Sequence, residues 1–226
     1  CGAAAAGAAF SPVSTPARPI EAVVFDIGGV LLDWNPRHLY RKLFGDDASG
    51  MERFLAEVCT QAWNERQDAG RPFAEAVTEL TARHPHLADL IQAYDTRWEE
   101  MLGGAIVETV EVLSALRRQA LPVYALSNFS AEKFALARRR FDFLDWFDGL
   151  VVSGEIGLIK PDPAIFRHLL RRFGLVPETT LFIDDVARNV EAAAALGLVA
   201  IRFESPTQLT AGLAWHGLLP ECRQPT

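Results

Sequence analysis

The amino-acid sequence predicts an α/β fold in which a doubly wound, Rossmann-like parallel sheet carries an inserted α-helical cap domain. The first observation is a set of short runs made only of apolar residues, which is typical of strands covered on both faces of a parallel sheet. The second is that helical patterns lie between the runs, and the third is one long interval without any run. The predicted strands cover residues 22–25, 123–126, 150–152, 181–183 and 199–201.

Apolar residues at helical spacing separate the later strands from one another. Such spacing occurs at residues 107–116, 165–173 and 187–196, and the last two stretches end at Gly174 and Gly197, as helices commonly do. The alternation of strands and helices predicts βαβ units. In such sheets ligands bind beyond the carboxyl ends of the strands, so we expect the functional site at that edge.

The long interval contains helical patterns and no predicted strand. The patterns lie at residues 39–44, 51–58, 73–80 and 87–98. An interval of about seventy residues is too long for a loop in a compact domain. We therefore predict a helical cap over the strand ends at residues 34–104 and a catalytic core at residues 20–33 and 105–226. Residues 1–19, which are rich in Ala, Gly, Pro and Ser, are expected to form a flexible tail.

The composition of the 226-residue chain argues against several classes of function. A net charge of −7 is unsuited to nucleic-acid binding, which requires a basic surface. No apolar run approaches the roughly 20 residues that span a membrane. The tightest basic run, at residues 138–140, is expected to be a solvated helix face. Cys1, Cys59 and Cys222 lack metal-ligand spacing, so we expect no disulfide framework, no zinc site and a cytoplasmic location.

Charged and hydroxyl side chains cluster where the predicted strands end. In chain order they are Asp26, Ser127, Lys160, Asp184 and Asp185. Three neighbouring carboxylates repel one another, and a hard cation such as Mg²⁺ relieves that repulsion through oxygen ligands. A metal and a lysine can neutralise a transferring phosphoryl group, which leaves one carboxylate free as a nucleophile. A surface lysine together with a helix-capping pair of aspartates is the alternative interpretation.

Lys160 carries more information than an average lysine because the chain contains three lysines against nineteen arginines. Pro161 and Pro163 follow it, and they hold the segment out of a helix and direct it to a fixed place. The hydroxyl of Ser127, together with backbone N–H groups at the start of the following helix, can hold phosphate oxygens.

Taken in this order, the residues resemble the four motifs of the haloacid dehalogenase-like hydrolase superfamily, from about Glu21 to Leu219. The motifs correspond to residues 25–31, 126–128, 160–161 and 184–189. The helical interval after the first motif is similar to the cap of that superfamily. The resemblance implies that Asp26 is the nucleophile, with Lys160 and Ser127 assisting it. It implies substrate contacts from Ser127, Asn128, Lys160, Gly28 and Gly29. The implied Mg²⁺ site consists of Asp26, Asp185, the carbonyl of Gly28 and, through water, Asp184 and Asn189.

The cap offers further candidates at its turn and at its entrance. Residues 67–71 resemble the glycine-containing cap turn that selects the substrate in similar proteins. The residues expected to face the substrate are Arg71, Asp68 and Trp63, with a place in the cap core as the alternative for Trp63. The chain enters the cap at Trp34, Asn35 and Arg37, where a hinge is the alternative for Trp34.

Gly28 departs from the pattern of the superfamily. Most of its phosphatases carry a second aspartate two residues after the nucleophile, which protonates the leaving oxygen. A general acid contributes about 10²–10⁴ in rate. Glycine at this position therefore leaves the proton donor unassigned, and it favours substrates with good leaving groups.

These residues predict a Mg²⁺-dependent phosphatase that hydrolyses a small phosphorylated metabolite through an aspartyl-phosphate intermediate on Asp26. A metal-free 2-haloacid dehalogenase that uses Asp26 is the first alternative, since a halide leaves without a proton. A catalytically idle phosphate-binding or interaction protein is the second. Asp184 and Asp185 favour the phosphatase, because a metal-free dehalogenase gains nothing from two more carboxylates. The sequence assigns neither one substrate nor an oligomeric state.

Overall fold

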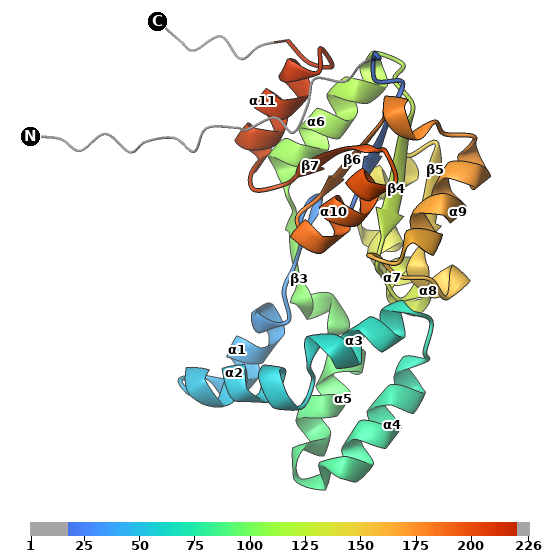
Figure 1. Cartoon of the computed structure of the whole chain (residues 1–226). Coiled ribbons are helices and arrows are strands. Elements are labelled where there is room, and N and C mark those ends of the chain that lie inside the picture. Colours follow the sequence, from blue (N-terminus) through green and yellow to red (C-terminus); the bar gives the residue numbers. More distant parts are fainter. Residues whose placement is uncertain (1–17, 221–226) are drawn as a thin grey trace, which may run out of the picture.

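Five parallel strands form the central sheet, in the order β5-β4-β1-β6-β7 (Figure 1). The structure, a computed structural model, describes residues 18–220, so most of the predicted tail, Cys1 and Cys222 lie outside it. The strands are β1 (Ala22–Phe25), β4 (Val123–Ser127), β5 (Gly149–Val152), β6 (Thr180–Asp184) and β7 (Val199–Arg202). Each matches a predicted strand to within one residue at either end, and all neighbours pair in parallel, which confirms the predicted fold class.

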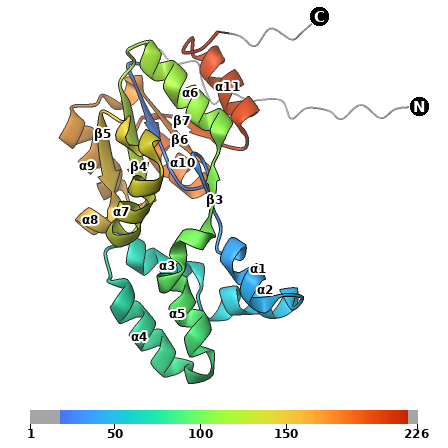
Figure 2. The ribbon, with the colours of Figure 1, turned by 180° about the vertical axis from the view of Figure 1, so that it is seen from behind.

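Helices cover both faces of the sheet (Figures 1 and 2). One face packs against α6 (Val107–Arg118), α7 (Ala131–Arg140) and α11 (Pro206–Trp215), and the other against α9 (Pro163–Phe173) and α10 (Ala187–Ala195). Val23 and Phe25 of β1 belong to the first apolar cluster and Val24 to the second. Successive strand residues point to opposite faces. A strand covered on both faces is therefore apolar throughout. The arginines at residues 138–140 are exposed at the end of α7, as predicted.

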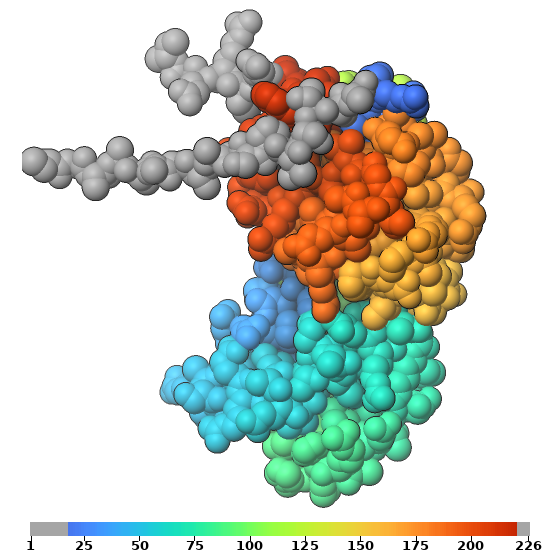
Figure 3. Space-filling view, viewed as in Figure 1, coloured from blue at the N-terminus to red at the C-terminus, as the bar shows by residue number. Residues whose placement is uncertain are grey.

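A helical lobe lies beyond the carboxyl ends of the strands (Figure 1), and the space-filling view shows it as a lobe below the core (Figure 3). It contains α1 (Arg37–Phe44), α2 (Ala48–Glu57), α3 (Gln61–Asp68), α4 (Phe73–Arg83) and α5 (Ala88–Thr96). Its aromatic core includes Tyr40, whose ring centroid lies 4.9 Å from that of Phe54 and 6.2 Å from that of Tyr94. Helix α3 was not predicted, because its sequence is polar and carries only one large apolar side chain, Trp63.

Two short strands connect the lobes. β2 (Leu32–Trp34) pairs antiparallel with β3 (Leu102–Ala105), so the two segments by which the chain passes between the lobes lie side by side. We expected no strand in this interval, and the reason is the sequence of β3, in which Gly103 and Gly104 interrupt the apolar run. The predicted cap boundaries at residues 34 and 104 fall inside this ribbon. No helix within residues 18–220 is long and apolar enough to cross a membrane, and the cytoplasmic location stays a prediction.

Candidate active site

The parallel register brings the predicted residues together at one edge of the sheet. Phe25, the last residue of β1, pairs with Ala125 of β4 and Ile183 of β6. The residue after Phe25, Asp26, therefore lies beside the end of β6, and its backbone N–H donates to the carbonyl of Ile183 at 2.8 Å. Asp26, Ser127, Lys160 and Asp184 are all buried. The convergence is as predicted, while the chemical roles of these residues stay predictions.

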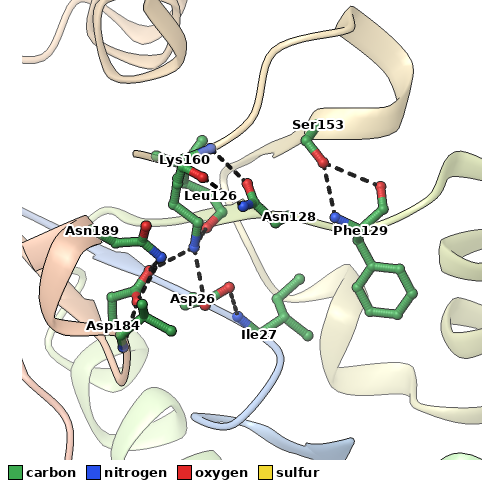
Figure 4. A network of polar contacts seen from close by, with 10 residues as sticks. Asp26, Ile27, Leu126, Asn128, Phe129, Ser153, Lys160, Asp184 and Asn189 are labelled. Atoms are coloured by element: carbon green, nitrogen blue, oxygen red, sulfur yellow. Dashed lines mark hydrogen bonds and ion pairs between the residues drawn. The ribbon is translucent and has the colours of Figure 1, made fainter. Parts of the chain in front are cut away.

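The ammonium group of Lys160 is the centre of the cluster (Figure 4). Its Nζ lies 3.0 Å from Asp26 Oδ2 and donates to Asp184 Oδ2 at 2.6 Å and to the carbonyl of Leu126 at 2.9 Å. An ammonium has three donors, and all three are used. Burial opposes the charged form, but the carboxylates of Asp26 and Asp184 outweigh it and raise the pKa of Lys160. The lysine is therefore held as a cation in a buried site.

Asn128 fixes the backbone of Lys160. The side chain of Asn128 donates to the carbonyl of Lys160 at 2.9 Å and accepts from its N–H at 2.8 Å. This two-way bond joins the end of β4 to the segment before α9 (Figure 4). Asn128 thus holds Lys160 in position as well as lining the cavity described below.

Asp184 is bonded by donors on both carboxylate oxygens. Oδ1 accepts from the N–H of Val186 at 2.9 Å and from Asn189 Nδ2 at 3.0 Å, while Oδ2 accepts from Lys160 and from Asn189 Nδ2 at 3.1 Å. The remaining oxygen of the amide, Asn189 Oδ1, is buried without a hydrogen-bond partner among the described residues. Asp184 and Asn189 therefore form a supporting layer around Lys160.

Three carboxylates could hold a metal ion. One oxygen each from Asp26, Asp184 and Asp185 lie within 4.8 Å of one another. Burial and the nearby aspartates raise the pKa of Asp26 to about 7, against the opposing effect of Lys160. Burial, followed by Asp184, also raises the pKa of Asp185. Such an acidic cluster, with a single lysine for three carboxylates, fits a hard divalent cation with oxygen ligands.

The backbone at Gly29 makes room for Asp185. Gly29 has φ +75°, and a Cβ placed there would lie 2.4 Å from Asp185 Oδ2. At Gly28 a Cβ would meet no atom within 4 Å. The first glycine of the pair is therefore not required by space, whereas the second is required by both its conformation and its neighbour.

The hydroxyl of Ser127 has no hydrogen-bond partner among the described residues, although it is buried at the end of β4. A buried hydroxyl without a partner costs about 1–3 kcal/mol, so an oxygen of a bound ligand would stabilise it. The serine does not itself line the cavity, and its role in substrate binding stays a prediction.

A cavity of about 460 Å³ lies between the core and the cap. Its core side contains Asp26, Gly28, Gly29, Asn128, Lys160 and Asp185, and Asn189 also borders it. Its cap side contains aromatic side chains together with amides and carboxyls, among them Asn64, Asp68 and Phe73. Asp26 and Lys160 therefore face a cavity whose far wall belongs to the cap.

The cap residues predicted to face the substrate fall in different places. Asp68 and Trp34 line the cavity. Arg71 instead pairs with Glu79 at 2.5 Å and Glu75 at 3.1 Å, outside the cavity lining. Trp63 packs edge-on against Tyr94 in the cap core, with ring centroids 5.0 Å apart. At the cap entrance, Arg37 pairs with Glu52 at 2.6 Å, and Asn35 accepts from the backbone N–H of Arg37 at 3.0 Å.

Other cavity residues were not found from the sequence. Asn64 and Phe129 line the cavity, as does Lys133, whose ammonium bonds to Asp95 across the lobes and lies 4.5 Å from the ring of Phe73. Lys133 had one available signal, the scarcity of lysine. Asn64 had none, because nothing local distinguishes an amide that faces a cavity from one that faces solvent.

Known proteins resemble the chain over most of its length. A model of the haloacid dehalogenase-like hydrolase family matches residues 20–197. The chain is 26% identical over 181 residues to the sesquiterpene phosphatase of Aspergillus oryzae, covering 80% of this chain and 88% of that protein. It is 28% identical over 193 residues to the phosphorylated carbohydrates phosphatase of Thermotoga maritima, covering 80% and 84%. It also spans 35% of the length of drimenol cyclase of Aspergillus calidoustus, at 26% identity over 195 residues.

Solved structures share the fold. A haloacid dehalogenase-like enzyme from Bacteroides thetaiotaomicron, solved with magnesium and inorganic phosphate, superposes with a TM-score of 0.62 at 24% identity, covering 82% of this chain and 95% of that one. The L-2-haloacid dehalogenase of Xanthobacter autotrophicus superposes with a TM-score of 0.58 at 21% identity, covering 89% and 85%. An enzyme that binds magnesium and phosphate and a haloacid dehalogenase therefore share this fold, so the fold alone does not distinguish a phosphatase from a dehalogenase.

Proposed function

The chain belongs to the haloacid dehalogenase-like hydrolase family, and we propose that it is a Mg²⁺-dependent phosphatase that uses Asp26 as its nucleophile. The observation that carries the proposal is the acidic cluster of Asp26, Asp184 and Asp185 around one buried lysine. A phosphoryl group brings negative charge, and a site for it needs cations beside the nucleophile. Lys160 supplies one, and the carboxylates provide ligands for a second.

The reaction has two steps. One oxygen of Asp26 bonds to phosphorus while the bond from phosphorus to the leaving oxygen breaks, and that oxygen takes up a proton. Water then attacks the aspartyl phosphate, which releases inorganic phosphate and restores the carboxylate. Asp26, Asp185 and the carbonyl of Gly28 would hold Mg²⁺, which offsets the charge on the transferring group. The positive charge of Lys160, whose three donors are bonded within the protein, also offsets the charge of that group, and Ser127 and the backbone at Gly29 hold its oxygens.

The substrate class follows from the size and lining of the cavity. About 460 Å³ suits the organic part of a small phosphorylated metabolite. The relatives support this size range, since one is named for phosphorylated carbohydrates and another for a sesquiterpene. Because aromatic side chains line the cap wall beside amides and carboxyls, we infer a leaving group with both an apolar surface and a hydroxyl.

A 2-haloacid dehalogenase is the second candidate, since Gly28 removes a proton donor that a halide does not need. Against it stand Asp184 and Asp185, because burial and these two carboxylates raise the pKa of Asp26, so that without a metal ion less of the nucleophile is ionised at neutral pH.

A panel of phosphate esters that includes p-nitrophenyl phosphate tests the proposal. We expect turnover with Mg²⁺, none with a chelator, and none from Asp26→Asn in either buffer. Halide release from 2-haloacids in the presence of chelator would support the dehalogenase instead. Phosphate binding without turnover of any compound would indicate an idle site and would contradict the proposal.

A further inference from the structure

The cap side of the cavity contains a carboxyl that the proposed mechanism does not use. When phosphorus transfers to Asp26, an alkoxide leaves, and an alkoxide is a poor leaving group unless it is protonated. Gly28 cannot supply the proton because it has no side chain, and a Cβ placed there would have no atom within 4 Å. The donor must therefore come from another wall of the same cavity.

Few side chains of the cavity wall are free to carry this proton. Asp26 and Asp185 belong to the acidic cluster at the strand ends. Glu65 pairs with Arg188 at 2.6 Å, and Lys133 is bonded to Asp95. Asp68, the last residue of α3, lines the cavity and makes no ion pair within residues 18–220. Among the cavity carboxyls outside the acidic cluster, it is the one that no cation neutralises.

The backbone of Asp68 is fixed to the core, although the residue belongs to the cap. Ser153 Oγ donates to the carbonyl of Asp68 at 2.5 Å and accepts from the N–H of Phe129 at 2.9 Å. Figure 4 shows Ser153 and Phe129 close to the Lys160 cluster. Two residues later a Cβ at Gly70 would lie 3.1 Å from the carbonyl of Gly154, so the cap turn closely approaches the core. The position of Asp68 over the strand ends is thus set by direct bonds between the lobes.

The carboxyl of Asp68 is also oriented. Asn64 Nδ2 donates to Asp68 Oδ2 at 2.9 Å, and the hydroxyl of Tyr94 donates to Asn64 Oδ1 at 3.1 Å. Tyr94 fixes which end of the amide faces Asp68, so Oδ2 of the carboxyl accepts a hydrogen bond from Asn64. Each carboxyl oxygen has two lone pairs, so the group can still carry a proton.

The surroundings of Asp68 favour the protonated form. Burial raises the pKa of Asp68 to about 7, the backbone N–H of Ser130 opposes this, and the charge of Glu65 adds to it. A general acid is most effective when its pKa lies near the working pH. Near neutrality a substantial fraction of Asp68 therefore carries the proton.

We propose that Asp68 is the general acid of the reaction, and this inference rests on the proposed phosphatase function. As the bond between phosphorus and the ester oxygen breaks, the proton of Asp68 moves to that oxygen and the product leaves as an alcohol. The carboxylate then takes one proton from the water that attacks the aspartyl phosphate, which restores the acid. A residue of the cap thus replaces the side chain absent at Gly28, and the site is complete only when the cap is closed.

The test compares two leaving groups in Asp68→Asn. For an alkyl phosphate that the wild type hydrolyses, we expect kcat to fall about 10²–10⁴-fold, since the alkoxide loses its proton donor. For p-nitrophenyl phosphate, whose phenolate leaves without a proton, we expect a loss below about tenfold. Glu65→Gln is the matched control, because it lines the same cavity from the same helix. It should change the two rates by similar factors.

A second variant protects the conclusion from a folding artefact. In the Asp68→Asn background, Gly28→Asp places a carboxyl in open space on the opposite wall. We expect it to restore alkyl phosphate turnover at least tenfold with little change for p-nitrophenyl phosphate. Equal losses for both substrates in Asp68→Asn would overturn the proposal, as would a wild type that hydrolyses p-nitrophenyl phosphate but no alkyl phosphate. A wild type without any Mg²⁺-dependent turnover would overturn the proposed function itself.

Discussion

The two walls of the cavity are built in different ways. On the core side, Lys160 and Asp184 are completely buried, and each of their polar atoms has a partner supplied by a strand end or the start of a helix. On the cap side, Asn64 and Asp68 lie among aromatic rings. Both belong to α3, and a few hydrogen bonds and ion pairs, such as that from Ser153 to the carbonyl of Asp68, connect this helix to the core. Buried charges persist only when they are paired, so the wall that performs charged chemistry must be rigid.

This difference indicates that the two walls have different functions in the reaction. The core wall provides charge neutralisation that is independent of the leaving group, whereas the cap wall touches the leaving group. Substitutions in the core wall should therefore affect all substrates alike, and substitutions in the cap wall should depend on the substrate. Substitutions in both walls test this rule, and the losses that we expect decrease from Asp26 to Arg71.

Asp26→Asn should remove the nucleophile and reduce kcat at least about 10⁴-fold for all substrates. Its fold should survive, because the amide has the same shape and because Lys160 keeps its bonds to Asp184 and to the carbonyl of Leu126. Steady-state kinetics together with a thermal melt measure both quantities. A loss limited to alkyl phosphates would place Asp26 with the leaving group and would contradict the assignment of the core wall.

Lys160→Met should reduce turnover about 10³-fold and also destabilise the fold. It leaves the buried carboxylates of Asp26 and Asp184 without their cation, and breaking a buried pair costs about 3–5 kcal/mol. Urea unfolding in the presence of a chelator measures the loss. Lys42→Met is the matched control, since Lys42 is 57% exposed in its pair with Glu100, and it should cost at most about 1 kcal/mol. Equal stability losses would contradict this account of the site.

Gly29→Ala should weaken activation by Mg²⁺ about tenfold, because its Cβ would displace Asp185. The left-handed conformation, with φ +75°, adds about 1–2 kcal/mol of strain. Gly174→Ala separates the two effects, since Gly174 is left-handed with φ +66° and a Cβ there meets nothing within 4 Å. We expect similar melting temperatures for both variants and a raised Mg²⁺ requirement for Gly29→Ala alone. A similar Mg²⁺ requirement would exclude Asp185 as a ligand.

Asp68, on the cap wall, should cause the decrease of kcat at high pH. An acid must be protonated to donate, and burial raises the pKa of Asp68 to about 7. For an alkyl phosphate, kcat should therefore fall above pH 7, towards tenfold per pH unit. The charged groups facing this cavity are Asp26, Glu65, Lys133, Lys160, Asp185 and Arg188. If Asp68→Asn kept the same decrease, one of these groups would be its source.

The sequence predicted the core wall better than the cap wall for a physical reason. Strands covered on both faces are apolar throughout, so the five strands and the polar residues after them, such as Asp26 and Asp184, could be located locally. Helix α3 has one large apolar residue and no period, and its orientation depends on bonds such as that between Ser153 and Asp68. Those bonds join segments 85 positions apart, and no local pattern encodes them.

Substitution of Arg71 tests the prediction that this residue faces the substrate, and we expect the smallest effect on activity here. The cap-turn resemblance places it towards the substrate, but its guanidinium pairs with Glu75 and Glu79 and lies outside the cavity lining. We therefore expect Arg71→Ala to change kcat/KM less than about twofold for every substrate and to cost at most about 1 kcal/mol in stability. A large rise in KM for one substrate would show that α3 and α4 rearrange on binding, because only such a movement brings Arg71 to the cavity.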